Sequence, residues 1–283
     1  MKRLFTLSAI CVAMLSLVGC GGNNYETRAR HWVCDHFDHY ACLDKERHAL
    51  YSFHEDISTG RVFLKVDLET MEETKIWDVK DNDGVTYSLD YGVEGYIIPE
   101  DKGYNNENSS FVIVGNDRNF ESNGQKFAHI YDTYTQRTKK ICQGDFVRVH
   151  GNIISCCVTS GIRNSAITSV DVYDAEGNKL TPKSYQGSIA KQGVIVELVE
   201  KDGNLAGSYY YTKYGPANRI YIYGAIDNDR EFEIEGFNSN GYNCEDWSGK
   251  IENGVITGEF HNTYNGRSYD FTLTEMLPVA AAQ

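Results

Sequence analysis

Apolar and polar positions alternate most clearly over residues 184–276, where short runs of period two follow one another closely. Such runs predict half-buried β-strands. The expected strands are residues 184–190, 193–201, 205–214, 218–226, 231–237, 246–252, 255–262 and 268–276. Asn253-Gly254 and Asn265-Gly266 separate two pairs of them, and Asn-Gly between alternating runs indicates a tight hairpin. The pattern predicts a roughly eight-stranded antiparallel β-barrel or sandwich.

The inward positions of this C-terminal region are expected at every second residue of its strands. They are Val196, Leu198, Phe232, Ile234, Ile256, Phe260, Phe271 and Leu273. Thr272 is expected to face outward beside Phe271. Because the hairpins are local and these residues supply an apolar face, we expect residues 184–276 to fold without the region before them.

Residues 43–183 contain a weaker repeat of alternating runs that end in an aspartate and restart with Lys and an apolar residue. The aspartates are Asp67, Asp132 and Asp174. An Asp side chain can close a turn, so each unit predicts a hairpin. The hairpins resemble those in the blades of β-propellers, although the spacing is irregular and the region holds sequence for only three blades. We predict an all-β chain whose residues 43–183 form a propeller-like or sandwich-like antiparallel β-region.

The N-terminus has a basic start, Lys2-Arg3, and an apolar run from Leu4 to Val18, which is typical of a secretory signal. The run ends in Leu17-Val18-Gly19-Cys20, which resembles the lipobox of bacterial lipoproteins. The resemblance implies that residues 1–19 are a signal peptide and that Cys20 is acylated and anchors the chain to a membrane. The residue directly after Cys20 is Gly21 and not Asp, which by analogy with other lipoproteins implies the outer membrane. The leaflet that the chain faces stays open.

A second resemblance lies in the C-terminal region. Gly207 to Tyr211, residues 220–224 and Trp247-Ser248-Gly249 are similar to a small β-domain of uncharacterised bacterial lipoproteins, and the tyrosine-rich sequence resembles lipoproteins of Bacteroidota. These resemblances imply fold and location, and no catalytic residue. The expected organisation is a signal peptide, an anchor with a Cys/His-rich arm, two β-regions and a tail, at residues 1–19, 20–42, 43–183, 184–276 and 277–283.

The net charge of the chain limits the classes of molecule that it can bind. The formal net charge is −13, and removal of Lys2 and Arg3 with the signal would make it −15. Such a chain repels nucleic acid and anionic lipid surfaces, so we expect no nucleic-acid partner and contact with the membrane only through the lipid on Cys20. A glycan or an envelope protein remains as a partner.

Six of the eight cysteines remain once Cys11 and Cys20 are set aside, namely Cys34, Cys42, Cys142, Cys156, Cys157 and Cys244. An exported chain with an even number of cysteines favours disulfides, and six allow 15 pairings. Cys34 and Cys42 lie close together, so we expect them to pair. The adjacent Cys156 and Cys157 point to opposite faces of a strand, so each should pack or bond elsewhere.

Two segments carry metal-ligand residue types, and we predict a metal at neither. Residues 31–54 hold five histidines with Cys34 and Cys42, but they lack paired zinc-ligand spacing. Asp81-Asn82-Asp83-Gly84 imitates a calcium loop, but the first ligand position would be Val79. A turn is the simpler interpretation. No cofactor is expected.

Candidate chemistry is sparse. The sequence has no G-x-S-x-G, S-x-x-K, H-E-x-x-H or G-x-x-x-x-G-K motif, and its carboxylates sit mainly at turns or alternate on strands. Closely spaced tyrosines are candidates for a binding surface, although packing is favoured for either strand face alone. They are Tyr209, Tyr210, Tyr211, Tyr221 and Tyr223.

We therefore expect an envelope-anchored lipoprotein with a non-catalytic binding or structural role. The alternatives are a protein-binding inhibitor or accessory subunit of an envelope enzyme, and an envelope hydrolase with an unrecognised carboxylate site.

Overall fold

The computed structural model describes residues 25–36, 41–56, 60–89, 110–116, 125–160 and 166–277. Cys20 and the predicted signal peptide lie outside the described residues. Within them the chain is all-β apart from one helix, which confirms the predicted fold class. No helix among the described residues is long and apolar enough to cross a membrane.

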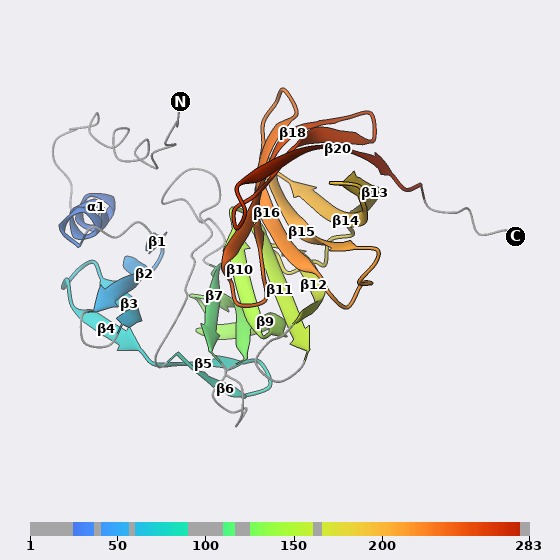
Figure 1. Cartoon of the computed structure of the whole chain (residues 1–283). Helices are drawn as coiled ribbons and strands as arrows, with labels where there is room; N and C mark the ends of the chain where they lie inside the picture. Colours follow the sequence, from blue (N-terminus) through green and yellow to red (C-terminus); the bar gives the residue numbers. More distant parts are fainter. Residues whose placement is uncertain are drawn as a thin grey trace, which may run out of the picture.

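Three sheets make up the N-terminal part, and all of their strand pairs but one are antiparallel (Figure 1). After helix α1 (Tyr25–Asp35), the first sheet is a meander of β1 (Ala41–Asp44), β2 (Ala49–Asp56), β3 (Gly60–Asp67) and β4 (Glu73–Ile76). The second has the order β6-β5-β9-β8-β7, from β5 (Asp78–Asp81), β6 (Thr86–Ser88), β7 (Ser110–Asn116), β8 (Lys126–Asp132) and β9 (Arg137–Gly144), with β5 and β9 parallel. The third contains β10 (Phe146–His150), β11 (Ile153–Ser160) and β12 (Ala166–Asp174).

The repeated aspartates act as the sequence predicts. The Oδ1 atoms of Asp67, Asp132 and Asp174 each accept two backbone N–H groups from residues two to four positions further on, at 2.7–3.1 Å. Each carboxylate therefore closes the turn after a strand, which is the local reason for the hairpins of this region.

The three sheets are stacked face to face. On the first sheet, Trp32 of α1 packs against one face, with Leu50 and Val66. The other face packs on the second sheet through the aromatic rings of Phe63 and Tyr131, whose centroids are 5.6 Å apart. We call the three sheets with α1 the stack.

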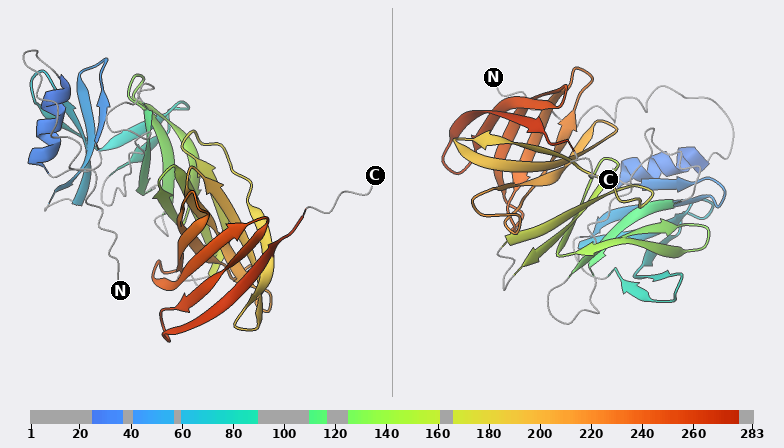
Figure 2. Two further views of the ribbon diagram at one scale, coloured as in Figure 1. Left: turned by 90° about the horizontal axis from the view of Figure 1, so that it is seen from above. Right: turned by 90° about the vertical axis from the view of Figure 1, so that its right-hand side faces the viewer.

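The stack continues into the C-terminal region. The second and third sheets share a cluster that includes Val114 and Ile154. The far face of the third sheet packs on the barrel described below, where Ile167 contacts Tyr221. Both views in Figure 2 show α1, the sheets and the barrel following one another in this order. The stacked sheets confirm the predicted propeller-like or sandwich-like β-region without deciding between these two forms, and α1 and the barrel cover its two end faces.

The C-terminal region is a closed barrel of eight antiparallel strands, and β13 pairs with β20 to complete it. The strands are β13 (Lys183–Ile189), β14 (Gln192–Lys201), β15 (Asn204–Tyr211), β16 (Ile220–Ile226), β17 (Glu231–Phe237), β18 (Asn243–Glu252), β19 (Val255–Asn262) and β20 (Arg267–Glu275). All eight predicted inward residues lie in its apolar core. The barrel alternative is therefore confirmed over the sandwich.

Large side chains fill the barrel. Trp247 lies at its centre, with ring centroids 5.0 Å from Tyr209, 5.3 Å from Phe260 and 5.1 Å from Phe271. All four side chains are buried. The interior is thus a packed core, and a ligand would have to bind on the outer wall or at an end.

Folding of residues 184–276 alone stays a prediction. It assumed that the barrel buries its apolar surface only in its own interior, and this assumption is incomplete. The barrel has a second buried surface on its outer wall, where Val199 and Ala206 pack against the third sheet with Ile153 and Val172. Tyr221 is buried on the same side. An isolated barrel would expose this apolar face to water.

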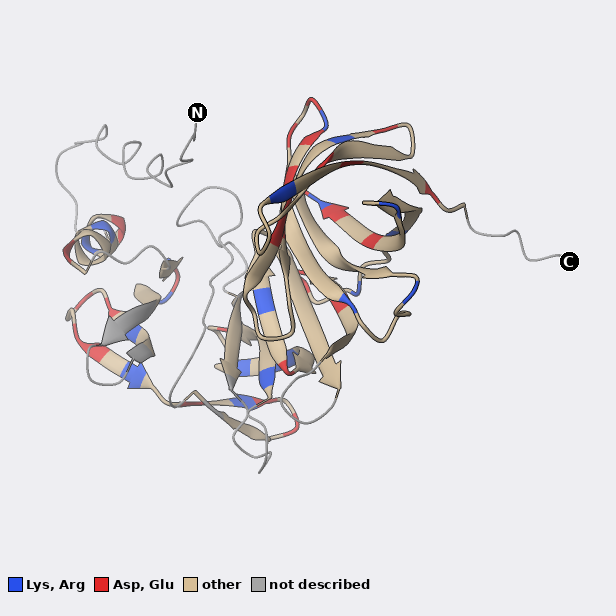
Figure 3. Ribbon diagram, viewed as in Figure 1, with Lys and Arg blue, Asp and Glu red and all other residues tan. Residues whose placement is uncertain are grey.

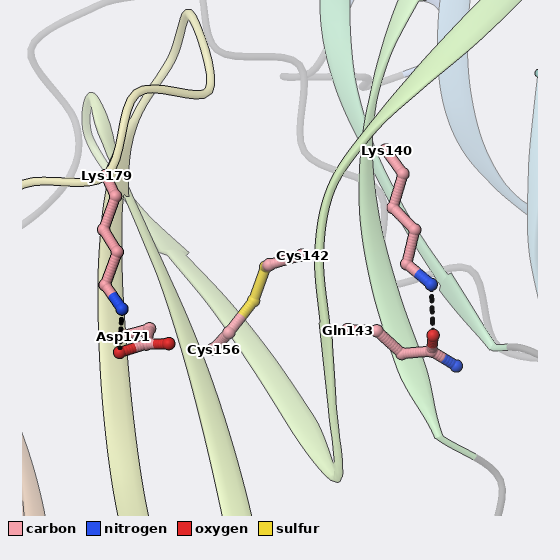
Figure 4. Close-up of a disulfide and its surroundings, with 6 residues drawn as sticks. All are labelled: Lys140, Cys142, Gln143, Cys156, Asp171 and Lys179. Carbon is pink, nitrogen blue, oxygen red and sulfur yellow. Dashed lines mark hydrogen bonds and ion pairs between the residues drawn. A yellow bond between two sulfur atoms is a disulfide. The ribbon is translucent and has the colours of Figure 1, made fainter. Parts of the chain in front are cut away.

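The predicted Cys34–Cys42 disulfide is wrong in the structure, where these two cysteines are not joined to each other. Cys42 points from β1 into the cluster between the first and second sheets, whereas α1, which carries Cys34, covers the opposite face. The disulfide instead joins Cys142 of β9 to Cys156 of β11 and links the second and third sheets (Figure 4). Cys157 faces the barrel, so the prediction of opposite faces for Cys156 and Cys157 is confirmed.

Helix α1 lies in the segment expected to be a disulfide-closed arm. Its Trp32 indole donates to the Glu73 carboxylate at 2.7 Å, and the Arg28 guanidinium donates to the Leu68 carbonyl at 2.6 Å. These two contacts fix the helix on β4 and on the turn that follows β3. The histidine-rich segment is therefore held by packing and hydrogen bonds rather than by a disulfide.

Candidate functional site

A groove of about 380 Å³ lies on the outer wall of the barrel, where β10 of the third sheet approaches it. Outward-facing residues of β16, β17, β18 and β19 form its floor, and His150 of β10 forms a side. We call it the outer groove. The charged lining residues are Glu233, Glu235, Asp246 and Glu259, with His150, Tyr223, Ser248 and His261 among the others.

Strand register explains why these residues meet. One row across the strands reads Tyr223, Glu235, Asp246 and His261, each directly opposite the next. The neighbouring row reads Ala225, Glu233, Ser248 and Glu259. Directly opposed residues have Cβ atoms about 5 Å apart, so four carboxylates converge within two adjacent rows.

The charges in the outer groove are not balanced by basic side chains. Within the described part of the chain, no Lys or Arg forms an ion pair with Glu233, Glu235, Asp246 or Glu259. Burial, and then the charge of Asp246 opposite, raises the pKa of Glu235 above its ordinary value. The Asn243 amide donates to Asp246 at 3.1 Å. The groove thus holds a like-charge pair in a partly desolvated position.

Aromatic rings form one side of the outer groove. Tyr223 stacks on Phe237, with centroids 5.0 Å apart, and the His150 ring lies 4.5 Å from Tyr223. Burial lowers the pKa of His150, against a smaller opposing effect of a backbone hydrogen bond at Gly224. His150 is therefore uncharged near neutral pH and does not neutralise the carboxylates.

The five tyrosines predicted as a binding surface do not form one. Tyr209 lies in the barrel core and Tyr211 packs against it, whereas Tyr221 is buried between the barrel and the third sheet. Tyr210 lies under the Arg219 guanidinium, 5.1 Å from the ring centroid. Only Tyr223 of this set lines the outer groove. The interpretation fails because Tyr209 and Tyr211 face the barrel interior and the third sheet covers Tyr221 on the outer wall.

The glutamates of β17 were the sequence signal for the outer groove. Glu231, Glu233 and Glu235 alternate with Phe232 and Ile234, a pattern that predicts a solvated strand face. That interpretation is correct for Glu231, which does not line the groove. The same interpretation does not reveal that Glu233 and Glu235 line the groove. Their neighbours on β18 and β19 follow only from the strand register, which the sequence does not give.

One further polar group lies inside the barrel. Glu245 of β18 is buried and accepts a hydrogen bond from the Tyr209 hydroxyl. Burial raises its pKa to about 7, while Tyr209 and Trp247 oppose the rise and the charge of Asp246 adds to it. The barrel core therefore contains one carboxyl whose charge changes near neutral pH.

The metal-ligand residue types of the two segments can be compared where the structure describes them. Among the described residues, no group of three or more His, Cys, Asp and Glu side chains is placed to hold a metal ion. Asp81 closes a turn, since its Oδ1 accepts from the N–H groups of Asp83 at 3.0 Å and Val85 at 2.8 Å. The turn interpretation of this segment is confirmed. His39 lies outside the described residues.

No protein-family model matches the chain, and no curated protein matches its sequence. Solved structures with some similarity include an oligogalacturonate lyase in complex with manganese, with 12% identity, 84% of this chain and 76% of that chain covered, and a TM-score of 0.29. TolB from Acinetobacter baumannii has 16% identity, 83% and 53% coverage and a TM-score of 0.26. This chain therefore spans about half of TolB. At these TM-scores the likeness says nothing about the outer groove.

Proposed function

We propose that the chain is an envelope-anchored lipoprotein with a non-catalytic binding role, and that the outer groove binds a positively charged organic group. The lipobox-like Leu17-Val18-Gly19-Cys20 supports the anchor. The filled barrel core supports a ligand site on the outer wall. A primary amine or a guanidinium group has the charge that the groove lacks.

The facing pair of Glu235 and Asp246 carries the proposal. Like charges directly opposite each other on a sheet destabilise it, and no Lys or Arg of the described chain forms an ion pair with either residue. A bound cation would relieve this repulsion and would gain charge-assisted hydrogen bonds. The rings of Tyr223 and His150 add an aromatic wall, against which cations bind favourably.

The size of the outer groove fits the same chemistry. A volume of about 380 Å³ is at the lower end of the range for small-molecule sites, so it suits a single amine-bearing molecule or one basic side chain. Insertion of a Lys or Arg from an envelope protein would use the same carboxylates. The alternative role as a protein-binding accessory subunit therefore shares this site.

Calorimetric titration of the purified full chain in detergent tests the groove. We expect spermidine and agmatine to bind, glycerol not to bind, and the affinity to fall as salt is added. Glu235→Gln and Asp246→Asn should each weaken binding by about tenfold. Glu231→Gln is the matched control, because it removes the same charge from the same strand outside the groove. Equal weakening by all three variants would show long-range attraction rather than a site.

Acyl labelling tests the anchor separately. We expect the wild-type chain to incorporate labelled palmitate and to fractionate with the outer membrane. Cys20→Ser should lose the label and remain an unprocessed precursor. Unchanged labelling of the Cys20→Ser chain would contradict the lipoprotein proposal and would leave the groove proposal standing.

A further inference from the structure

One end of the barrel carries exposed tyrosines on three neighbouring hairpin loops. In a meander, alternate loops lie at the same end, so residues 212–219, 238–242 and 263–266 share one rim. Each contributes one tyrosine, namely Tyr214, Tyr242 and Tyr264, with 57%, 68% and 70% of its surface exposed. We call this set of loops the tyrosine rim. Exposed aromatic rings gathered in one place indicate a contact surface.

The tyrosine rim differs in composition from the opposite end. Its three loops contain no Asp or Glu and no Leu, Ile, Val or Met, although the chain carries a net charge of −13. The loops at the opposite end include Asp202, Asp227 and Asp229 and no aromatic residue. Figure 3 shows acidic and basic residues interspersed over the stack and the barrel, so the absence of carboxylates at the rim is local.

Turns hold the rim tyrosines in place. Asn238 and Asn262 each accept two backbone N–H groups of their own loops through Oδ1, at 2.9–3.2 Å. The Asn238 amide also donates to the Tyr264 hydroxyl at 2.9 Å, which ties two loops together. Contacts that fix a side chain before binding reduce the entropy lost on binding.

Tyr214 is supported from the barrel core. Its ring lies 6.4 Å from that of Tyr211, edge to face, and Tyr211 lies 5.6 Å from Tyr209 in the same way. The Lys213 ammonium lies 5.5 Å above the Tyr214 ring. The rim thus presents supported aromatic faces beside amide groups, with few charges.

This chemistry matches a sugar ring better than a protein surface. A pyranose has an apolar face of C–H groups, which stacks on an aromatic ring, and an edge of hydroxyls, which hydrogen-bond with amides. A protein interface of ordinary size buries about 800 Å² per partner around an apolar centre, and these loops offer no large aliphatic side chain to build one.

The negative net charge of the chain favours neutral polysaccharides over acidic ones. A net charge of −13 repels acidic polymers, and of the rim cations Arg219 is already paired with Glu197 at 2.6 Å. We propose that the tyrosine rim binds a neutral polysaccharide, with Tyr214, Tyr242 and Tyr264 stacking on its sugar rings. This site is separate from the outer groove and does not depend on it.

Affinity electrophoresis of the purified full chain in detergent tests the proposal. The gels contain amylopectin, mixed-linkage β-glucan, galactomannan or arabinoxylan, with polygalacturonate as the acidic polymer. We expect at least one neutral polysaccharide to retard the chain and polygalacturonate not to. Tyr214→Ala, Tyr242→Ala and Tyr264→Ala should each raise the dissociation constant about tenfold or more.

Tyr134→Ala is the matched control, because Tyr134 has the same exposed fraction of 70% but lies in the turn between β8 and β9 of the stack. Tyr264→Phe should retain most of the affinity, since it keeps the ring. Glu235→Gln in the outer groove should change nothing, which separates this test from that of the groove. The proposal is overturned if no neutral polysaccharide retards the chain, if only polygalacturonate does, or if Tyr134→Ala weakens binding as much as the rim variants.

Discussion

The stack and the barrel bury apolar surface in two different ways. Each sheet of the stack is covered on both faces, so neighbouring residues of a strand enter different clusters, as Ile153 and Ile154 do in β11. The barrel closes on itself, and most of its strands have one buried and one exposed face, as Phe271 and Thr272 show. The stack needs covers for its two end sheets, whereas the barrel has no strand edge to cover and needs a cover only where its outer wall is apolar.

The stack and the barrel meet where barrel strands no longer have one buried and one exposed face. On β15 and at Tyr221 of β16 the outward side is buried as well, because this part of the outer wall covers the third sheet. This shared surface makes the barrel a structural part of the stack as well as the carrier of the outer groove and the tyrosine rim. The difference between the stack and the barrel therefore predicts which substitutions destabilise one region and which destabilise both.

The largest effect is expected in the barrel core. Phe271→Ala should lower the free energy of unfolding by about 3–5 kcal/mol, because the ring is buried against Trp247 and its loss leaves a cavity. Thr272→Ala, at the exposed neighbouring position, should change it by about 0.5 kcal/mol or less. Urea unfolding of the full chain measures both. Equal losses would contradict the one-faced register of β20.

The stack should depend on its disulfide. Cys142→Ala combined with Cys156→Ala should cost about 3 kcal/mol, because the bond closes a chain segment with a sequence separation of 14 and joins two sheets. Cys157→Ala is the control, since it removes a buried thiol from the same strand and leaves the bond. Urea unfolding under oxidising and reducing conditions should show that only the wild type and the control lose stability on reduction.

The sequence predicted the barrel well because its outer faces are polar. Phe232, Glu233, Ile234 and Glu235 alternate in sequence as they do in space, and β17 and β19 have the predicted bounds. In the stack, β11 begins Ile153-Ile154-Ser155-Cys156-Cys157, all buried, so period two is lost there. In the stack, the sequence still predicted the turns that the aspartates close, because those hydrogen bonds join residues close in sequence.

The contacts between distant strands could not be predicted in the same way. The Cys142–Cys156 bond depends on which faces two different sheets present to each other, and Cys34 and Cys42 were closer in sequence. The outer groove joins Glu235 to Asp246 and His261 through the barrel register. Helix α1 buries only Ala29 and Trp32, a pattern too short to stand out in the sequence.

The two regions should respond to pH in opposite directions, and Glu245 sets the response of the barrel. Its pKa is raised from 4.5 to about 7 by burial, so its contribution to stability is present below pH 4.5 and lost as the pH rises through 7. Glu245→Gln should flatten this slope and stabilise the chain at pH 8 by at most about 3 kcal/mol. Glu231→Gln, which removes a carboxylate outside the barrel core, should not stabilise the chain in this way. Parallel pH profiles of the wild type and Glu245→Gln would contradict the assignment.

His129 sets the response of the stack. Burial lowers its pKa from 6.5 to about 4, with a smaller effect of the Lys140 charge in the same direction and of Asp81 against it. The neutral ring, whose Nδ1 lies 2.9 Å from the Thr138 hydroxyl, therefore contributes stability above pH 6.5 that is lost as the pH falls through 4. His129→Asn should make the free energy of unfolding less dependent on pH between 6.5 and 4, by at most about 3 kcal/mol.

The smallest effect concerns a turn that both regions share. Asp132 in the stack and Asn262 in the barrel each accept two backbone N–H groups through Oδ1. Because the turn is local and exposed in both, Asp132→Ala and Asn262→Ala should each cost about 1 kcal/mol, whatever the packing around them. Asp132→Asn keeps the acceptor and should be close to neutral. A clearly larger loss for Asp132→Ala alone, measured by urea unfolding, would mean that this turn is part of the packing between sheets, and that hairpin chemistry in the stack is not as local as the sequence repeat implies.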